Sequence, residues 1–346
     1  MKKLFVSLVA LVVATMSYAQ SNLLATLSHE GNISAFYGAS ALQSAVAAAE
    51  SGDVITLSSG QFDAADIDKP ITLRGSGMSA STDSVHYRDA TIVQGELTIN
   101  IADTLGKRLV MEGLYFNKKI TYAGILKDAQ FLKCRFQSFI AADSAVINNT
   151  AFIHCRFYNG YTQAANSNAL FINSIVCCPL NPSTSSIEFD NCFVKFDYTT
   201  TYGKYVVNVN NAYYKNSIIH QTTNGSSDIY TIPSNCIAHN CIGLGYSSIF
   251  KNINNKTNKY VSDITKVFNT YRSSTNTFIN DSWSFELTDE AAATYLGTDG
   301  TQVGVYGGNL IYNENPTIPQ ITKCIVASKS TADGKLSVDI EVRAAE

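Results

Sequence analysis

Hydrophobic and polar positions repeat along the middle of the chain. The segment Phe131–Phe136 alternates apolar and polar residues, and the same pattern recurs in Phe152–Phe157, 21 residues later. Gly113–Phe116 fits one step earlier. A fixed period of this length indicates stacked copies of one supersecondary unit. We therefore predict that the central chain folds into similar coils of about 21 residues each.

The repeat continues downstream in a changed form, as Asn followed by Ser or Cys and then Ile or Phe. The spacings between the copies are 18, 25 and 24 residues, which indicates loop insertions. Because Asn tolerates the left-handed backbone of a sharp bend, we expect these residues to form a structural ladder, hydrogen-bonded from coil to coil. A polar binding column is the alternative. The asparagines are Asn173, Asn191, Asn216 and Asn240.

Short β-type runs, broken by Asn, Gly, Ser or Asp, fill each unit, and no long amphipathic helix separates them. This pattern predicts an all-β solenoid with three short strands and three bends per coil, and coils stacked about 4.8 Å apart. The phase of the later coils stays open. Ile175, Phe193 and Ile218 align with the outward Arg135, so that an Asn bend or a bulge could reverse the pattern there.

The two ends of the repeat need caps, because open coils expose strand edges. Ser40 precedes an amphipathic segment, which predicts a capping helix over Ala41–Glu50 and a first strand at Val54–Leu57. Beyond Pro319, two strands are expected at Ile321–Ser328 and Lys335–Arg343, with Asp333-Gly334 in the turn between them. We divide the chain into residues 1–19, 20–314 (the solenoid) and 315–346 (a hairpin that is a cap or a tail).

Residues 1–19 have the pattern of a secretory signal peptide. Lys2 and Lys3 precede the apolar run Leu4–Ala14, and Ser17–Ala19 supplies small residues for cleavage after Ala19. We expect a secreted protein that is periplasmic, on the cell surface or extracellular. A buried N-terminal helix is the alternative. The run is too short to cross a bilayer, and no later stretch is long enough, so no membrane span is expected.

Composition narrows the classes of partner. Only 15% of the residues are charged, against about 25% in an average domain, and the formal net charge is −3. This excludes a global basic field for nucleic acid. The apolar content of 45% and the small net charge also argue against intrinsic disorder.

Several motifs resemble the opening and closing coils of pectin-lyase-like right-handed parallel β-helix proteins. They are Leu42-x-x-Ala45-x-x-Ala48, Gly52–Leu57, Gly60–Phe62, Lys69–Gly75 and Asp299–Gly308. The resemblance covers residues 37 to 308, with the middle matched by repeat pattern alone. It implies a right-handed coil and contact with carbohydrate. It implies no single activity, because the family includes pectate lyases, polygalacturonases, adhesins and members without known activity.

Catalytic motifs of the family are not found in their usual order. The chain lacks the Asn-Thr-Asp, Asp-Asp, Gly-His-Gly and Arg-x-Lys series of the galacturonan hydrolases. Glu188 and Asp190 share a strand face, which leaves calcium as an alternative to a solvated surface. No other cofactor is expected, and whether the protein is an enzyme (a lyase or a glycoside hydrolase) stays open.

A basic patch is the first candidate site. The repeat stacks Lys133 near His154 and Arg135 near Arg156, and all four alternate with inward residues, so we expect them to face solvent. Stacked like charges repel, and an acidic polysaccharide would relieve that repulsion. In a lyase, such cations neutralise the substrate carboxylate while Lys, His or Arg abstracts the proton. The alternative is that Glu112, Asp128 and solvent neutralise the patch.

Tyrosines form the second candidate surface. Their rings can stack on sugar faces while the hydroxyls form hydrogen bonds, although Tyr is also an ordinary β-surface residue. The tyrosines concerned are Tyr198, Tyr202, Tyr205, Tyr213 and Tyr214.

The chain has eight cysteines, which could be free thiols, disulfides or metal ligands. Cys134 and Cys155 occupy the same repeat position, and we interpret them as stacked buried thiols rather than a disulfide. Cys236-x-x-His239-x-Cys241 leaves zinc as an alternative, but it is a lone cluster, so no metal is expected.

Taken together, these patterns predict an exported β-helix that binds polysaccharide, acidic polymers included, without a recognisable catalytic site. A polysaccharide lyase that uses the basic patch is one alternative, and a structural or adhesive solenoid is the other. The oligomeric state stays open.

Overall fold

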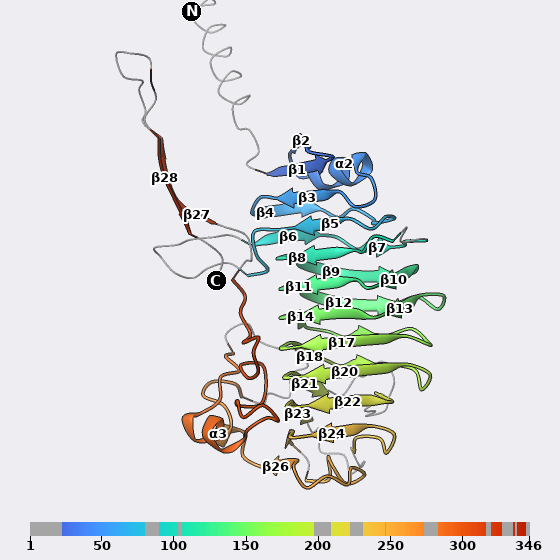
Figure 1. Ribbon diagram of the computed structural model, residues 1–346, viewed down its shortest axis with the longest axis vertical. Helices are drawn as coiled ribbons and strands as arrows, with labels where there is room; N and C mark the ends of the chain where they lie inside the picture. Colours follow the sequence, from blue (N-terminus) through green and yellow to red (C-terminus); the bar gives the residue numbers. More distant parts are fainter. Residues whose placement is uncertain are drawn as a thin grey trace, which may run out of the picture.

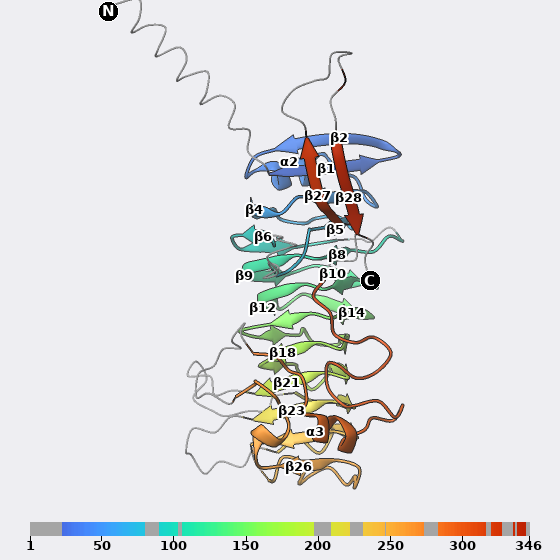
Figure 2. The ribbon, with the colours of Figure 1, turned by 90° about the vertical axis from the view of Figure 1, so that its left-hand side faces the viewer.

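The protein is a parallel β-solenoid, seen from two sides in Figures 1 and 2. The structure is a computed structural model. It describes residues 23–79, 90–102, 106–196, 209–221, 231–245, 247–272, 283–315, 320–326, 335 and 338–343. The coils stack along the long axis of the molecule, from α2 at one end to β26 at the other. The predicted all-β solenoid fold is therefore confirmed. Its right-handedness stays a prediction.

Two long sheets run the length of the solenoid. The eleven-stranded sheet of the described residues has, in spatial order, β2 (Asn32–Tyr37), β1 (Leu24–His29), β3 (Val54–Leu57), β5 (Thr72–Arg74), β8 (Val110–Glu112), β11 (Gln130–Leu132), β14 (Thr150–Ile153), β17 (Asn168–Ile172), β20 (Ser186–Asp190), β22 (Ala212–Lys215) and β24 (Ile237–His239). From β3 onward, each strand pairs in parallel with the next coil.

The thirteen-stranded sheet of the described residues follows one bend later in each coil. Its main path is β26 (Lys259–Val261), β25 (Ile242–Leu244), β23 (Ile218–Gln221), β21 (Phe193–Phe196), β18 (Ile175–Cys177), β15 (Arg156–Phe157), β12 (Arg135–Ala141), β9 (Tyr115–Tyr122), β6 (Thr91–Gln94) and β4 (Gly60–Asp63). Three short strands pair beside this path, namely β7 (Leu97–Ile99), β16 (Tyr161–Thr162) and β19 (Pro179–Leu180). A third, short pairing joins β10 (Ile125–Lys127) to β13 (Val146–Asn148).

The inward positions of the repeat form the core. Phe131 pairs in register with Phe152, 21 residues later, as the repeat predicts. Phe171 and Phe189 continue the same column, and neighbouring rings stack with centroids 4.7 to 5.1 Å apart. Since each ring contacts the one a coil above and below, the alternating apolar pattern fixes both the register and the interior of the solenoid.

The outer face of the thirteen-stranded sheet is also buried over its later coils. Arg135, Arg156, Ile175, Phe193 and Ile218 pair in one register column, so the phase does not reverse after the Asn bends. From Ile175 on, this column is apolar because the chain after β26 folds back over it. A second hydrophobic cluster joins it to residues of the 267–312 segment, among them Phe268, Tyr271, Phe285, Val303 and Tyr312.

The returning chain includes the short helices η1 (Ile264–Lys266) and α3 (Asp289–Thr294) and then ascends beside the coils (Figures 1 and 2). Residues 296–315, which we call the strap, pass along the bend that joins the two long sheets. Asn240 Nδ2 donates to Leu296 O, and Asn216 Nδ2 donates to Thr298 Oγ1, both at 3.3 Å. The strap therefore runs from the later coils toward the earlier ones, opposite to the order of the coils in the sequence.

All four Asn of the predicted ladder have the left-handed backbone, with φ between 42° and 52°. The expected hydrogen bonds from coil to coil are not what holds their side chains. Asn173 Nδ2 donates to Val305 O and Gly307 O, each at 2.8 Å, and these are strap carbonyls. Asn191 is buried where a Cβ on Gly307 or Gly308 would lie within 3 Å of its Nδ2. The four asparagines, aligned in successive coils, therefore form the surface against which the strap packs.

The described ends of the chain add elements to the coils. Helix α2 (Ala41–Ala48) forms where a helix over Ala41–Glu50 was predicted, but it ends two residues earlier. It buries Leu42, Ala45 and Val46, and the side chain of Ser40 makes no capping hydrogen bond. The antiparallel pair β1 and β2 was not predicted. At the other terminus, β27 (Gln320–Val326) and β28 (Val338–Arg343) form the expected antiparallel hairpin, whose predicted turn lies outside the described residues.

Candidate functional site

The basic patch predicted from the repeat is not open to solvent. Lys133, His154 and Arg156 are only 7%, 8% and 5% exposed, and Arg135 is partly buried. Their side chains do project from the outside of the coil, but the strap contacts Lys133, His154 and Arg156. Arg135 lies over the rings of Tyr115 and Tyr158. The expectation of a solvent-facing patch was wrong, because the sequence does not show that a distant segment returns to this bend.

The strap supplies polar partners to three of these side chains. Lys133 Nζ donates to Asn315 O at 2.7 Å, and Arg156 Nη1 lies 3.3 Å from Glu314 Oε1. His154 Nε2 lies 3.1 Å from Leu310 O, and burial lowers the pKa of His154. Glu314 is therefore an acid beside the patch, whereas sequence reasoning named Glu112 and Asp128.

The predicted tyrosine surface divides into three parts. Tyr198, Tyr202 and Tyr205 lie outside the described residues. Tyr214 points into the core, where its ring stacks on Phe189 at 5.1 Å, so its proposed contact with a ligand was wrong. Burial raises the pKa of Tyr214 well above its usual range. Tyr213, one residue earlier, faces outward from β22, as the period of two in a strand requires.

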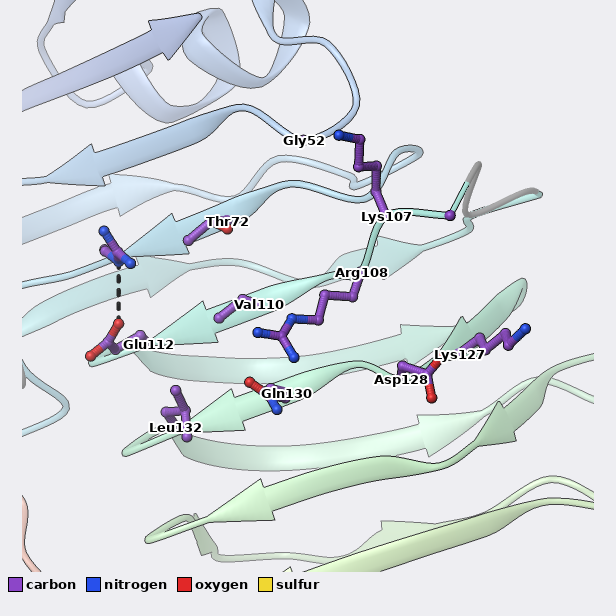
Figure 3. Close-up of a pocket in the computed structure, with 12 residues that line it drawn as sticks. Gly52, Thr72, Lys107, Arg108, Val110, Glu112, Lys127, Asp128, Gln130 and Leu132 are labelled. Atoms are coloured by element: carbon purple, nitrogen blue, oxygen red, sulfur yellow. Dashed lines mark ion pairs between the residues drawn. The ribbon is translucent and has the colours of Figure 1, made fainter. Parts of the chain in front are cut away.

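An open cleft lies elsewhere, on the outer face of the eleven-stranded sheet (Figure 3). It has a volume of about 590 Å³. The cleft extends over β5, β8 and β11 and the turns that lead into them. Its lining residues are Gly52, Thr72, Arg74, Gly106, Lys107, Arg108, Val110, Glu112, Lys127, Asp128, Gln130 and Leu132.

Four of the lining side chains are cationic and two are anionic. Arg74 Nε pairs with Glu112 Oε2 at 3.3 Å, so this acid is already engaged. Asp128 Oδ1 accepts a hydrogen bond from Asn149 Nδ2 at 2.7 Å. Within the part of the chain that the structure describes, no ion pair involves the remaining cations, Lys107, Arg108 and Lys127. We call these three residues the cleft cations.

The cleft cations approach from different directions. Figure 3 shows Arg108 extending over the sheet between Val110 and Gln130, while Lys107 reaches toward Gly52. A Cβ on Gly52, whose φ is 96°, would lie 3.4 Å from Lys107 Cδ. All three cleft cations are exposed to solvent.

The solenoid register builds this cleft. Thr72, Val110 and Gln130 occupy one outward column, and Leu73 and Met111 beside them point into the core. Lys107 and Arg108 precede β8 by one residue, Leu109, and reach the rim of the same face. Sequence reasoning missed this site. The available signal was an adjacent Lys-Arg pair just before a strand, in a chain that otherwise contains little charge.

The carboxylates that left calcium open share a face, as predicted. Glu188 and Asp190 both point outward from β20, and Asp190 Oδ2 accepts from Lys215 Nζ at 2.8 Å. Burial and then the Asp190 charge raise the pKa of Glu188. No group of three or more His, Cys, Asp or Glu side chains suited to a metal occurs among the described residues. In the cluster considered for zinc, Cys241 is buried while His239 is exposed.

Three comparisons with known proteins found no match. The chain matches no protein-family model, no curated protein and no solved structure. Among the described helices, none has the length and apolar content needed to cross a membrane.

Proposed function

We propose that this protein is an exported β-helix that binds acidic polysaccharide in the cleft of β5, β8 and β11. The observation that supports the proposal is the set of cleft cations, Lys107, Arg108 and Lys127, which have no ion-pair partner among the described residues. Export, a right-handed coil and kinship with pectin-lyase-like proteins belong to the same proposal and account for the expected contact with polysaccharide.

A polyanion suits this cleft better than a neutral glycan does. An exposed guanidinium or ammonium group gains from a carboxylate or sulfate, because the resulting hydrogen bonds are charge-assisted. Thr72 and Gln130 add neutral donors and acceptors for hydroxyl groups. The chain as a whole is weakly acidic, so attraction to a polyanion is local to the cleft and should decline with salt.

The test is a binding screen against immobilised acidic and neutral polysaccharides. Wild type should bind uronate polymers more strongly than neutral glucans. Lys107→Ala with Arg108→Ala should weaken uronate binding about tenfold, as expected for two exposed charge-assisted contacts. The matched control is Lys251→Ala with Lys256→Ala, which removes the same charge from exposed sites near the other end of the solenoid.

The control should bind like wild type. Equal weakening in both double variants would mean that net charge, and not the cleft, governs binding. Absence of uronate binding in wild type would end the proposal.

A further inference from the structure

The outward column that lines the cleft continues along the eleven-stranded sheet. After Gln130, the same register position is occupied by Ala151, Leu170, Glu188 and Tyr213 in successive coils. The strands that carry them follow one another without a gap in Figure 1. Gln130 and Tyr213 are four coil steps apart, about 19 Å at the usual strand spacing. Ala151 and Leu170, which follow the cleft, are apolar and carry no charge.

An aromatic and apolar platform lies at the far end of this column. Tyr213 and His239 come from neighbouring strands, and their rings meet edge to face with centroids 5.9 Å apart. Ile237, the register partner of Tyr213, is 54% exposed. Asn255 Nδ2 lies 2.6 Å from His239 Nδ1 and donates to Ala238 O at 3.0 Å, which fixes the histidine ring. We call Tyr213, Ile237 and His239 the Tyr213 platform.

Polar groups border the platform. Lys215 and Asp190 form their ion pair on the adjacent outward column, where both side chains are partly exposed. A partly exposed ring with polar groups beside it suits the surface of a sugar, which presents apolar C–H faces and a rim of hydroxyls.

We infer that the Tyr213 platform is a second subsite for the polymer whose anionic groups bind in the cleft, with the polysaccharide extended along the solenoid axis. The cleft binds charge, and the platform stacks on a sugar ring several units away. This inference rests on the proposed function, since it assigns the same ligand to a second place on the same sheet. It adds a direction for the chain and a minimum ligand length.

Chain length provides the test. Affinities of wild type, Arg108→Ala and Tyr213→Ala should be measured by calorimetry for oligogalacturonates from dimers to octamers. Dimers can contact only one site, so Arg108→Ala should weaken them while Tyr213→Ala should not. Octamers reach both sites, so their affinity for wild type should rise steeply, and Tyr213→Ala should reduce it about tenfold.

Two further variants serve as controls for the role of the Tyr213 ring. Tyr213→Phe keeps the ring and should retain most of the octamer affinity. Tyr37→Ala removes a ring that is 60% exposed on β2, away from the column, and should change nothing. Octamer binding that depends on Arg108 but not on Tyr213 would overturn the second subsite and leave the cleft intact. Failure of wild type to bind any oligomer would instead overturn the proposed function.

Discussion

At the residue scale, the cysteines act as hydrogen-bond donors inside the bend. Cys155 Sγ lies 3.2 Å from Phe131 O in the preceding coil, and Cys192 Sγ lies 3.3 Å from Phe171 O. Ser174 takes the equivalent position between them and donates its hydroxyl to Phe152 O at 3.1 Å. The alternation of Cys and Ser in the repeat follows, because each supplies a small donor for the same carbonyl. These thiols are free and buried, as predicted.

This role predicts how the position tolerates change. Cys155→Ser keeps a donor of similar size and should alter the free energy of unfolding by less than about 1 kcal/mol. Cys155→Val has a similar volume but no donor, and it should cost about 1–3 kcal/mol because the buried carbonyls lose a partner. Urea denaturation of both variants checks this. A Val variant as stable as the Ser variant would show that the thiol only fills space.

The same burial predicts slow thiol chemistry. Burial raises the pKa of Cys134 and of Cys241 to about 12, so little thiolate is present near neutral pH. Titration with a thiol reagent in native protein should leave Cys134, Cys155, Cys192 and Cys241 unmodified, and denaturation without reductant should release them. A Cys134–Cys155 disulfide found by mass spectrometry would contradict the stacked geometry.

A buried histidine should govern part of the acid sensitivity. Burial, reinforced by the nearby Lys195 charge, lowers the pKa of His220 to about 3, and its Nδ1 lies 2.6 Å from the Tyr271 hydroxyl. Since the pKa of an unfolded His is about 6.5, the unfolded chain binds a proton that the folded protein does not between those values. The free energy of unfolding should therefore fall as pH decreases from about 6.5 to 3.

His220→Gln should make that acid limb shallower, measured as the unfolding free energy against pH. His29 is the control, because its hydrogen bond to Asp53 raises its pKa. Its contribution is present below about 6.5 and is lost as pH rises through the folded pKa, so His29→Gln should not make the acid limb shallower. An identical acid limb in wild type and His220→Gln would refute the assignment.

At the scale of elements, the strap is the feature that sequence patterns could not reveal. The period of the repeat predicts which residues stand at the bend, and the left-handed backbone at Lys133, His154 and Asn173 agrees with it. What those side chains touch depends on a segment more than a hundred residues away that has no periodicity of its own. The same is true of Ile175 and Phe193, whose outward apolar positions make sense only under the returning chain.

The strap contact can be measured against a matched bend. Asn173 and Asn166 both have a left-handed backbone, with φ of 42° and 54°, but only Asn173 binds the strap, and Asn166 is exposed. Both Ala variants incur the same backbone strain, so their difference isolates the side-chain contacts. Asn173→Ala should destabilise the protein by about 1–3 kcal/mol more than Asn166→Ala. Equal costs in thermal or urea unfolding would mean that the strap contributes little stability.

At the scale of the whole molecule, two groups of cationic side chains differ in their exposure to solvent. The repeat places one set of cations at Lys133 and Arg156, where the strap covers them, and at Arg135, which is partly buried. A second set, Lys107, Arg108 and Lys127, lies at the cleft and is exposed. Sequence reasoning found the first set because it repeats, and it missed the second because turn residues share no period. The fold was thus predictable from periodicity, whereas the surface open to a ligand was not.

The central claim is that the cleft cations recognise a polyanion. The most direct measurement is the dissociation constant of a long oligogalacturonate, titrated by calorimetry at low and high salt, for wild type and for Lys107→Ala with Arg108→Ala. We predict that, at low salt, wild type binds more tightly than the variant does. The affinity of wild type should also decline more steeply with salt, because the variant lacks the exposed contacts. The same affinity and the same salt dependence in both proteins would contradict the account.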